Sequence, residues 1–115
     1  MNKVLMAIQQ EFKAGKDMTN EFGGFKYRNV ESMLTDLKPI LKEHDAYITF
    51  LDDVVQCGER FYIEATVVLH TEEGDEYSKA LAREQESKKG MDAAQITGSC
   101  STYARKYALC GLLAV

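Results

Sequence analysis

Hydrophobic side chains recur every three or four residues in three segments of the chain, which is the period of an amphipathic helix. The first segment is Lys3–Phe12. The second begins after Asn29, a residue that suits the N-terminal cap of a helix, and continues to about His44. It contains Pro39, which is expected to kink it. The third begins near Asp92 and occupies the rest of the chain.

Between the second and third helices the pattern changes to alternation of apolar and polar residues, which predicts β-strands. We expect strands, joined by short glycine-containing turns, over Ala46–Gln56, Phe61–His70 and Glu76–Arg83. The short alternating segment Phe25–Arg28 is a candidate for a further strand. Short turns indicate an antiparallel meander with one face packed and one face free. The sequence therefore predicts an α+β fold in the order α-(β)-α-β-β-β-α, with a three- to four-stranded sheet packed against helices.

Length and composition indicate one domain with a single hydrophobic core, because the chain has 115 residues of which 45% are hydrophobic. No apolar run is long enough to span a membrane, and the start is too polar for a signal peptide. Cys57, Cys100 and Cys110 have no metal-binding spacing, and His44 and His70 lie far apart. We expect reduced thiols, no metal site and a cytoplasmic protein.

The net charge of −4 is unevenly distributed along the chain. Residues 45–77 hold nine acidic side chains and one basic one, Arg60, so this segment carries −8 and the remainder carries +4. Acidic turns between strands are often simply solvated, which is an equally good explanation for the acidic segment. The net charge therefore does not exclude nucleic-acid binding.

The final helix carries two distinct stripes. Its narrow polar stripe consists of Gln95, Ser99, Thr102 and Lys106. Its apolar stripe, expected to pack in the core or against another subunit, consists of Ile96, Cys100, Tyr103, Tyr107 and Cys110. Arg105 and Lys106 have no acidic residue three or four positions away on this helix. We therefore expect both of these cations to bind phosphates, together with the polar stripe.

Basic residues at two other places suit single-stranded nucleic acid. In the segment before Asn29, the ring of Tyr27 can stack on a base while Lys26 and Arg28 contact phosphates. An edge strand with its rings in the core explains the same pattern. The second group, which also fits a solvated loop, consists of Lys79, Arg83, Lys88 and Lys89.

Patterns of catalytic residues are missing from the sequence. No nucleophile and histidine recur at a catalytic spacing, and no glycine-rich phosphate-binding loop is present. We expect a protein that is not an enzyme and uses no cofactor.

Two segments resemble the essential recombination function (ERF) superfamily of phage single-strand annealing proteins. Phe25–Leu41, FKYRNVESMLTDLKPIL, is similar to the family's aromatic–Lys–Tyr start of a helix that ends in a Pro-hydrophobic pair. Gln95–Val115, QITGSCSTYARKYALCGLLAV, is similar to its Gln–x–x–Gly–Ser…Thr–Tyr–Ala–Arg–(Arg/Lys)–Tyr–Ala–Leu signature. The resemblance covers the chain from Phe25 to the C-terminus.

The resemblance implies ATP-independent binding of single-stranded DNA and annealing of complementary strands in phage or prophage homologous recombination. It implies a homo-oligomeric ring or filament in the host bacterial cytoplasm, with the host single-strand-binding protein as a further partner. Family members usually continue into a charged tail, so residues 1–115 are expected to be the annealing core domain without it. The residues that match motif positions are Lys26, Tyr27, Arg28, Gln95, Ser99, Thr102, Tyr103, Arg105 and Lys106.

These observations suggest one DNA-binding groove per subunit, lined by the basic residues, with neighbouring subunits continuing the groove. The main alternative is a small oligomeric interaction module that contacts a recombination or defence protein without annealing DNA. The acidic balance and the missing tail favour that alternative. A metal-dependent nuclease is a second alternative.

Overall fold

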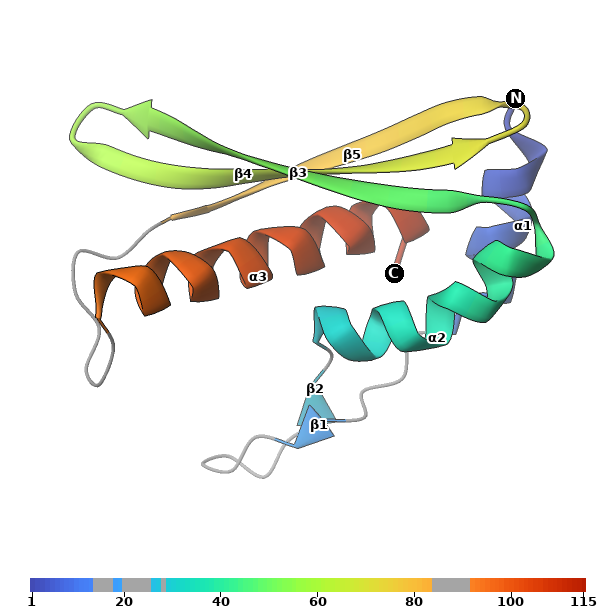
Figure 1. Cartoon of the computed structure of the whole chain (residues 1–115), viewed down its shortest axis with the longest axis horizontal. Coiled ribbons are helices and arrows are strands. Elements are labelled where there is room, and N and C mark those ends of the chain that lie inside the picture. Colours follow the sequence, from blue (N-terminus) through green and yellow to red (C-terminus); the bar gives the residue numbers. More distant parts are fainter. Residues whose placement is uncertain (14–17, 20–25, 28, 84–91) are drawn as a thin grey trace.

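The computed structural model describes residues 1–13, 18–19, 26–27, 29–83 and 92–115. Its elements (Figure 1) are α1 (Lys3–Glu11), β1 (Met18–Thr19), β2 (Lys26–Tyr27), α2 (Val30–Glu43), β3 (Tyr47–Cys57), β4 (Arg60–Thr71), β5 (Gly74–Arg83) and α3 (Ala93–Leu113). They follow the predicted order except for the short strand β1, which the sequence pattern did not predict. One sheet has the order β3-β4-β5, and β1 pairs with β2 in a second, two-stranded sheet. All pairings are antiparallel. The α+β class and the antiparallel meander are thus confirmed.

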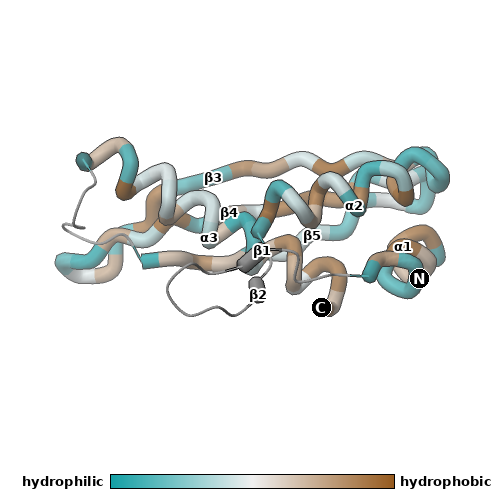
Figure 2. The backbone as a smooth tube through the Cα atoms, turned by 90° about the horizontal axis from the view of Figure 1, so that it is seen from below, coloured by the Kyte–Doolittle hydropathy of each residue, from teal (hydrophilic) through white to brown (hydrophobic). Residues whose placement is uncertain are grey.

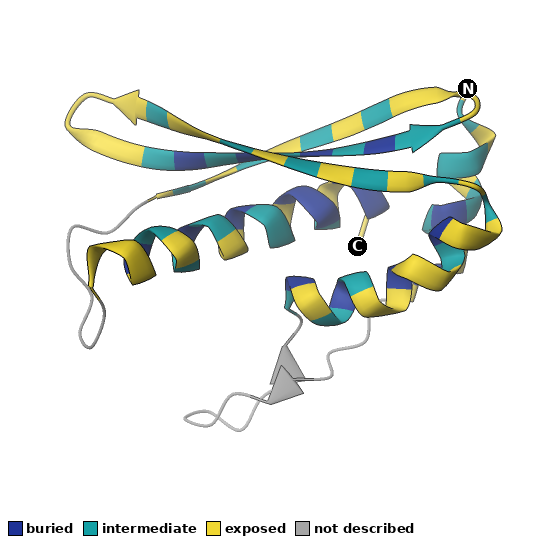
Figure 3. Ribbon diagram, in the orientation of Figure 1, coloured by how far each residue is buried: buried dark blue, intermediate teal, exposed yellow. Residues whose placement is uncertain are grey.

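The three-stranded sheet has one covered and one open face (Figure 3). Every second residue of β4 is buried, and these residues are Ile63, Ala65, Val67 and Leu69. The described helices lie on this side of the sheet (Figure 1 and Figure 2), with α3 running along β4 and β5. The turns before β4 and β5 use Gly58 at φ 63° and Gly74 at φ 118°, backbone conformations that side chains other than glycine rarely adopt. The predicted packed and free faces are therefore present.

The long helix α3 packs across β4 and β5 through a stripe that moves around the helix. Its buried residues recur every four positions, at Ile96, Cys100, Ala104, Ala108 and Leu112. Four residues advance more than one full turn, so this stripe shifts by about 40° at each step. Near the C-terminus, Leu109 and Leu113 are also buried. The backbones approach closely there, because a Cβ on Gly111 would lie 2.7 Å from Ser78 Oγ.

Tyr103 and Tyr107 do not pack into the core of the protomer, so that expectation is wrong. Their side chains are 50% and 54% exposed, whereas Ile96 is buried as predicted. The prediction assumed a straight apolar stripe. The buried stripe instead moves to Ala104 and Ala108, and the two tyrosines are left on the solvent side. Packing of these rings against a second subunit stays a prediction.

The first two helices complete the core beside α3. Asn29 caps α2 as expected, because its side chain accepts a hydrogen bond from Ser32 N at 2.7 Å. The helix continues past Pro39, which is exposed, as far as Glu43. Ile8 of α1 and Leu37 of α2 are fully buried. None of the helices in the described part of the chain combines the length and the apolar character that crossing a membrane requires.

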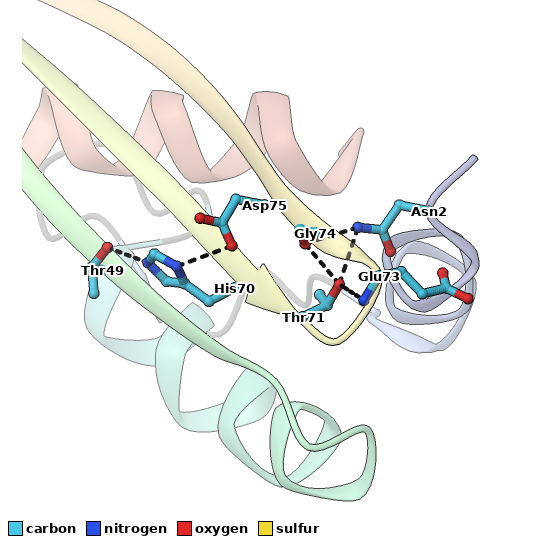
Figure 4. Close-up of polar contacts among 7 residues, drawn as sticks. All are labelled: Asn2, Thr49, His70, Thr71, Glu73, Gly74 and Asp75. Carbon is cyan, nitrogen blue, oxygen red and sulfur yellow. Dashed lines mark hydrogen bonds and ion pairs between the residues drawn. The ribbon is translucent and has the colours of Figure 1, made fainter.

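The N-terminus of α1 is anchored to the β4–β5 turn (Figure 4). The amide of Asn2 donates to Thr71 Oγ1 at 3.1 Å and to Gly74 O at 3.3 Å. The Glu73 carboxylate accepts hydrogen bonds from the backbone N–H groups of Lys3 and Val4. A negative charge at a helix N-terminus is stabilising, so the acidic turn has a structural role.

Candidate nucleic-acid interface

The solvent side of α3 presents a cation between two exposed aromatic rings. Lys106 Nζ lies 5.3 Å from the ring centroid of Tyr103 and 4.9 Å from that of Tyr107. Cation–π contacts of this kind are worth about 0.5–1 kcal/mol at exposed sites. In the described part of the chain, the ammonium makes no ion pair with an acid. We call these three side chains the Lys106 cluster.

Hydroxyl and amide groups extend the Lys106 cluster toward the start of α3. Ser99 is half-buried and Thr102 is exposed, with Thr102 Oγ1 donating to Gly98 O at 3.1 Å. Gln95 is exposed, but its Oε1 accepts from Asp92 N at 2.9 Å while Asp92 Oδ1 accepts from Gln95 N at the same distance. This reciprocal capping box stabilises the start of the helix. The carbonyl end of Gln95 therefore has a structural partner.

Arg105 is paired within the protomer, contrary to the expectation that it is a free phosphate ligand. Its Nε lies 3.1 and 3.2 Å from the two carboxylate oxygens of Asp52, and one Nη lies 3.1 Å from Asp52 Oδ2. The guanidinium also lies 5.3 Å from the ring centroid of Phe50. Both partners belong to β3. Spacing along the helix reveals only acids of the same helix, whereas this acid is brought in by the sheet.

Asp52 is held as a carboxylate by this arrangement. Burial by itself raises its pKa, but the hydrogen bonds from Arg105 and from the Ser101 hydroxyl, with the positive charge of Arg105, outweigh burial and lower the pKa below its usual value. Ser101 donates to Asp52 Oδ2 at 2.5 Å. The Asp52–Arg105 pair is therefore a structural link between β3 and α3.

The other predicted DNA-binding residues do not all join the Lys106 cluster. Arg83 is opposite Tyr62 in the register, on the sheet face that turns away from α3. Arg28, Lys88 and Lys89 lie outside the described residues. The backbone of β2, which contains Lys26 and Tyr27, lies on the helical side of the molecule (Figure 1). The structure thus separates Arg83 from Lys106.

The free sheet face holds a polar row that the sequence did not indicate (Figure 4). His70 Nδ1 lies 3.2 Å from Asp75 Oδ1, and His70 Nε2 lies 2.9 Å from Thr49 Oγ1. The imidazole also stacks on Tyr47, with ring centroids 4.4 Å apart. The alternation of side chains along each strand places these residues on one face of the sheet. Only the pairing register of the three strands brings them next to one another. The row orders the end of the sheet.

One group of potential metal ligands lies between the ends of α1 and α2. Single ligand atoms of Glu11, Glu43 and His44 lie within 4.8 Å of one another. Both carboxylates are exposed, and His44 Nε2 is already 3.1 Å from Glu11. This hydrogen bond accounts for the group as a link between the two helices.

Comparison with known proteins decides the family. A family model described as the ERF superfamily matches residues 1–115. The chain belongs to the ERF superfamily. A relative, the essential recombination function protein of Salmonella phage P22, is 44% identical over 111 residues, which is 96% of this chain and 53% of the relative. The chain thus spans about half the length of that relative. No solved structure matches the chain.

The two ERF-like segments have distinct structural roles in this domain. Phe25–Leu41 includes β2 and most of α2, and Gln95–Val115 forms nearly all of α3. Within the second segment, Arg105 contacts the sheet while Lys106 faces solvent between two rings. Adjacent cations of one motif thus have different environments.

Proposed function

We propose that this ERF domain binds single-stranded DNA along the solvent side of α3 and anneals complementary strands in homologous recombination. The observation that carries the proposal is the Lys106 cluster, a cation held between two half-exposed rings. Proteins that bind single strands without sequence preference combine positive charge with aromatic rings on which bases stack. The name of the phage P22 relative, an essential recombination function protein, supports the biological setting.

In the proposed complex, Tyr103 and Tyr107 stack on bases while Lys106 contacts the phosphate chain. The hydroxyls of Ser99 and Thr102 add hydrogen bonds to the backbone of the strand. Helix α3 contains no acidic residue that would repel DNA. The contributions of Lys26, Tyr27, Arg28, Lys88 and Lys89 to DNA binding stay predictions from the sequence.

Annealing in this proposal requires no nucleotide hydrolysis. Duplex stacking itself releases about 1.4 kcal/mol per base step. The protein needs only to keep each strand extended and to reduce the repulsion between two phosphate chains. We therefore expect annealing of complementary oligonucleotides without ATP and without a cofactor.

Three alanine variants test the DNA surface. Tyr103→Ala and Tyr107→Ala should each raise the Kd for a short fluorescent oligo-dT by about 5- to 100-fold, the loss of one stacking contact. Lys106→Ala should weaken binding and make the logarithmic salt dependence less steep by about 0.7. Fluorescence anisotropy measures both quantities.

Tyr77→Ala is the matched control, because this ring is 67% exposed on the opposite face of the sheet. It should leave the Kd for the short oligonucleotide unchanged. Equal affinities for wild type and all three α3 variants would refute the DNA surface. If the variants instead lose subunit assembly and keep short-oligonucleotide binding, the two rings serve subunit packing. If the wild-type protein binds no single-stranded DNA, the alternative function, an interaction module that does not anneal DNA, is better supported.

A further inference from the structure

The outer strands of the sheet are long and regular. Strand β3 has 11 residues and β5 has 10. In the described ranges, the only strand that pairs with either of them is β4. Their registers run without a bulge, and neither strand contains proline. Such edges add further strands unless something covers them.

The edge of β3 carries one feature that usually discourages a further strand from pairing with it, but contacts within the protomer neutralise that feature. An inward-pointing charge on an edge strand discourages pairing because a partner strand would bury it. Asp52 is such a charge, and Arg105 and Ser101 already satisfy it. A strand added beside Asp52 would meet a paired carboxylate.

The two edges present the same order of exposed side chains on the free face. On β3 the order is Tyr47, Thr49, Leu51, Asp53, with Tyr47 60% and Leu51 68% exposed. On β5 the order is Tyr77, Lys79, Leu81, Arg83, with Tyr77 67% and Leu81 53% exposed, so only the second position differs in kind before the charged one. The spacing is identical in both strands, and the final residue is acidic on one edge and basic on the other.

We propose that β5 of one copy pairs in parallel with β3 of a second copy, so that the sheet continues head to tail through the assembly. In this register Tyr77 lies beside Tyr47 of the next copy, and Leu81 lies beside its Leu51. Arg83 lies beside Asp53 of the next copy. When both copies keep α3 on the same side of the sheet, the fold sets this direction, because β3 and β5 both run antiparallel to β4 and are therefore parallel to each other.

The positions of the charged side chains favour this register over registers shifted along the strands and over other pairs of edges. In the described residues, neither Asp53 nor Arg83 has an ion-pair partner within its own copy. Lys79 Nζ lies 3.7 Å from Glu64 Oε1 of the same copy, so this ammonium is less available to a carboxylate of a second copy. Two β3 edges would bring their acidic residues together. Opposite edges of two copies are thus the complementary pair.

Head-to-tail contacts of this kind repeat, and they form a ring if the rotation closes or a filament if it does not. Every copy would keep α3 on the same side of the sheet, so the Lys106 clusters would follow one another along the assembly. This use of the assembly rests on the proposed function. The pairing of the edges does not require DNA.

Two single-edge variants test the assembly. Leu51→Glu blocks the β3 edge and Leu81→Glu blocks the β5 edge. Each variant alone should sediment as a monomer, whereas wild type forms larger species. An equimolar mixture should form a heterodimer and nothing larger, because one intact β5 edge and one intact β3 edge remain. Met6→Glu, at an exposed position of α1, is the matched control and should assemble like wild type.

Several results of sedimentation velocity would overturn the proposal. Monomeric wild type at high concentration would do so, as would either variant assembling to the wild-type size. A Leu51→Glu homodimer would show that two β5 edges pair with each other.

A charge exchange tests the same register if circular dichroism shows that the glutamate variants do not fold. The variants are then Asp53→Arg and Arg83→Asp. Each alone should weaken association at least tenfold, and their mixture should restore it. A mixture of Asp53→Arg with Lys79→Asp is the control and should not restore association. If the mixture of Asp53→Arg with Arg83→Asp does not restore association either, the register is refuted.

Short oligonucleotides separate this proposal from the DNA surface. The monomeric Leu51→Glu variant should bind short oligo-dT with the wild-type Kd, because its Lys106 cluster is intact. Lys106→Ala should lose DNA affinity and keep the wild-type sedimentation. If Leu51→Glu sediments like wild type, the pairing of the edges fails. If Lys106→Ala binds short oligo-dT with the wild-type Kd, the DNA surface fails.

Discussion

Asp52 gives Arg105 a structural partner within the protomer, and a contact between Arg105 and DNA stays a prediction. The arginine contacts both oxygens of the carboxylate, and Ser101 donates a third hydrogen bond. Lys106, the next residue, has no such partner in the described structure and lies over two exposed rings. Two adjacent cations of one motif therefore differ because they project from different sides of the helix.

The Asp52–Arg105 link should make stability depend on pH. The pKa of Asp52 is lowered from 3.8 in the folded protein, so the link contributes fully above that value and is lost as pH falls through the lower folded pKa. We expect Asp52→Asn to reduce the free energy of unfolding by about 1 kcal/mol at neutral pH, since both side chains are partly exposed. Urea unfolding at neutral pH and again well below the usual aspartate pKa measures the difference.

The difference between wild type and Asp52→Asn should shrink in acid, because wild type also loses the charge there. Asp36→Asn on the exposed surface of α2 is the control and should cost little at either pH. An equal loss for Asp52→Asn at both pH values would contradict the assignment.

Helix α3 depends on its first turn as well as on its buried stripe. The capping box joins Asp92 and Gln95 at two hydrogen bonds of 2.9 Å each. Caps of this type are worth about 0.5–2 kcal/mol, so the motif glutamine has a structural role independent of DNA.

Gln95→Ala separates these two roles. We expect a loss of up to about 1 kcal/mol in the free energy of unfolding, because one of the two capping hydrogen bonds disappears. Gln10→Ala, an exposed glutamine of α1, should change stability less. Unfolding in urea and oligo-dT anisotropy are measured on the same preparations. Unchanged stability with reduced DNA affinity would show that Gln95 acts on the strand and not as a cap.

At the scale of the whole molecule, charge is divided between the sheet and the helical side. Residues 45–77, which form β3, β4, the turns and the start of β5, carry −8, while α3 has basic residues and no acidic ones. A net charge of −4 therefore describes no single surface of this protein.

This division predicts a steep salt dependence for an acidic protein. Binding of oligo-dT should weaken with salt, with a logarithmic slope of about −0.7 for each phosphate contacted. Titrations over a range of NaCl concentrations measure the slope. A flat response would mean that phosphates are not contacted and that the helical side does not hold the strand.

The sequence by itself determined the elements and the family of this protein. Periodicity located the three helices and the three strands of the meander, and Asn29 and Asp92 marked two helix starts correctly. These features are local, because caps and periods depend on residues a few positions apart. The ERF resemblance likewise rested on contiguous motifs and is confirmed.

Only the tertiary structure decided which side of α3 is free and which cation is paired. The buried stripe follows the contact with the sheet, so Tyr103 and Tyr107 are exposed although they share a helical stripe with buried Cys100. Arg105 meets Asp52 across 53 residues of sequence. Such contacts depend on how β3 and α3 are placed in space, and no spacing within either segment specifies that placement.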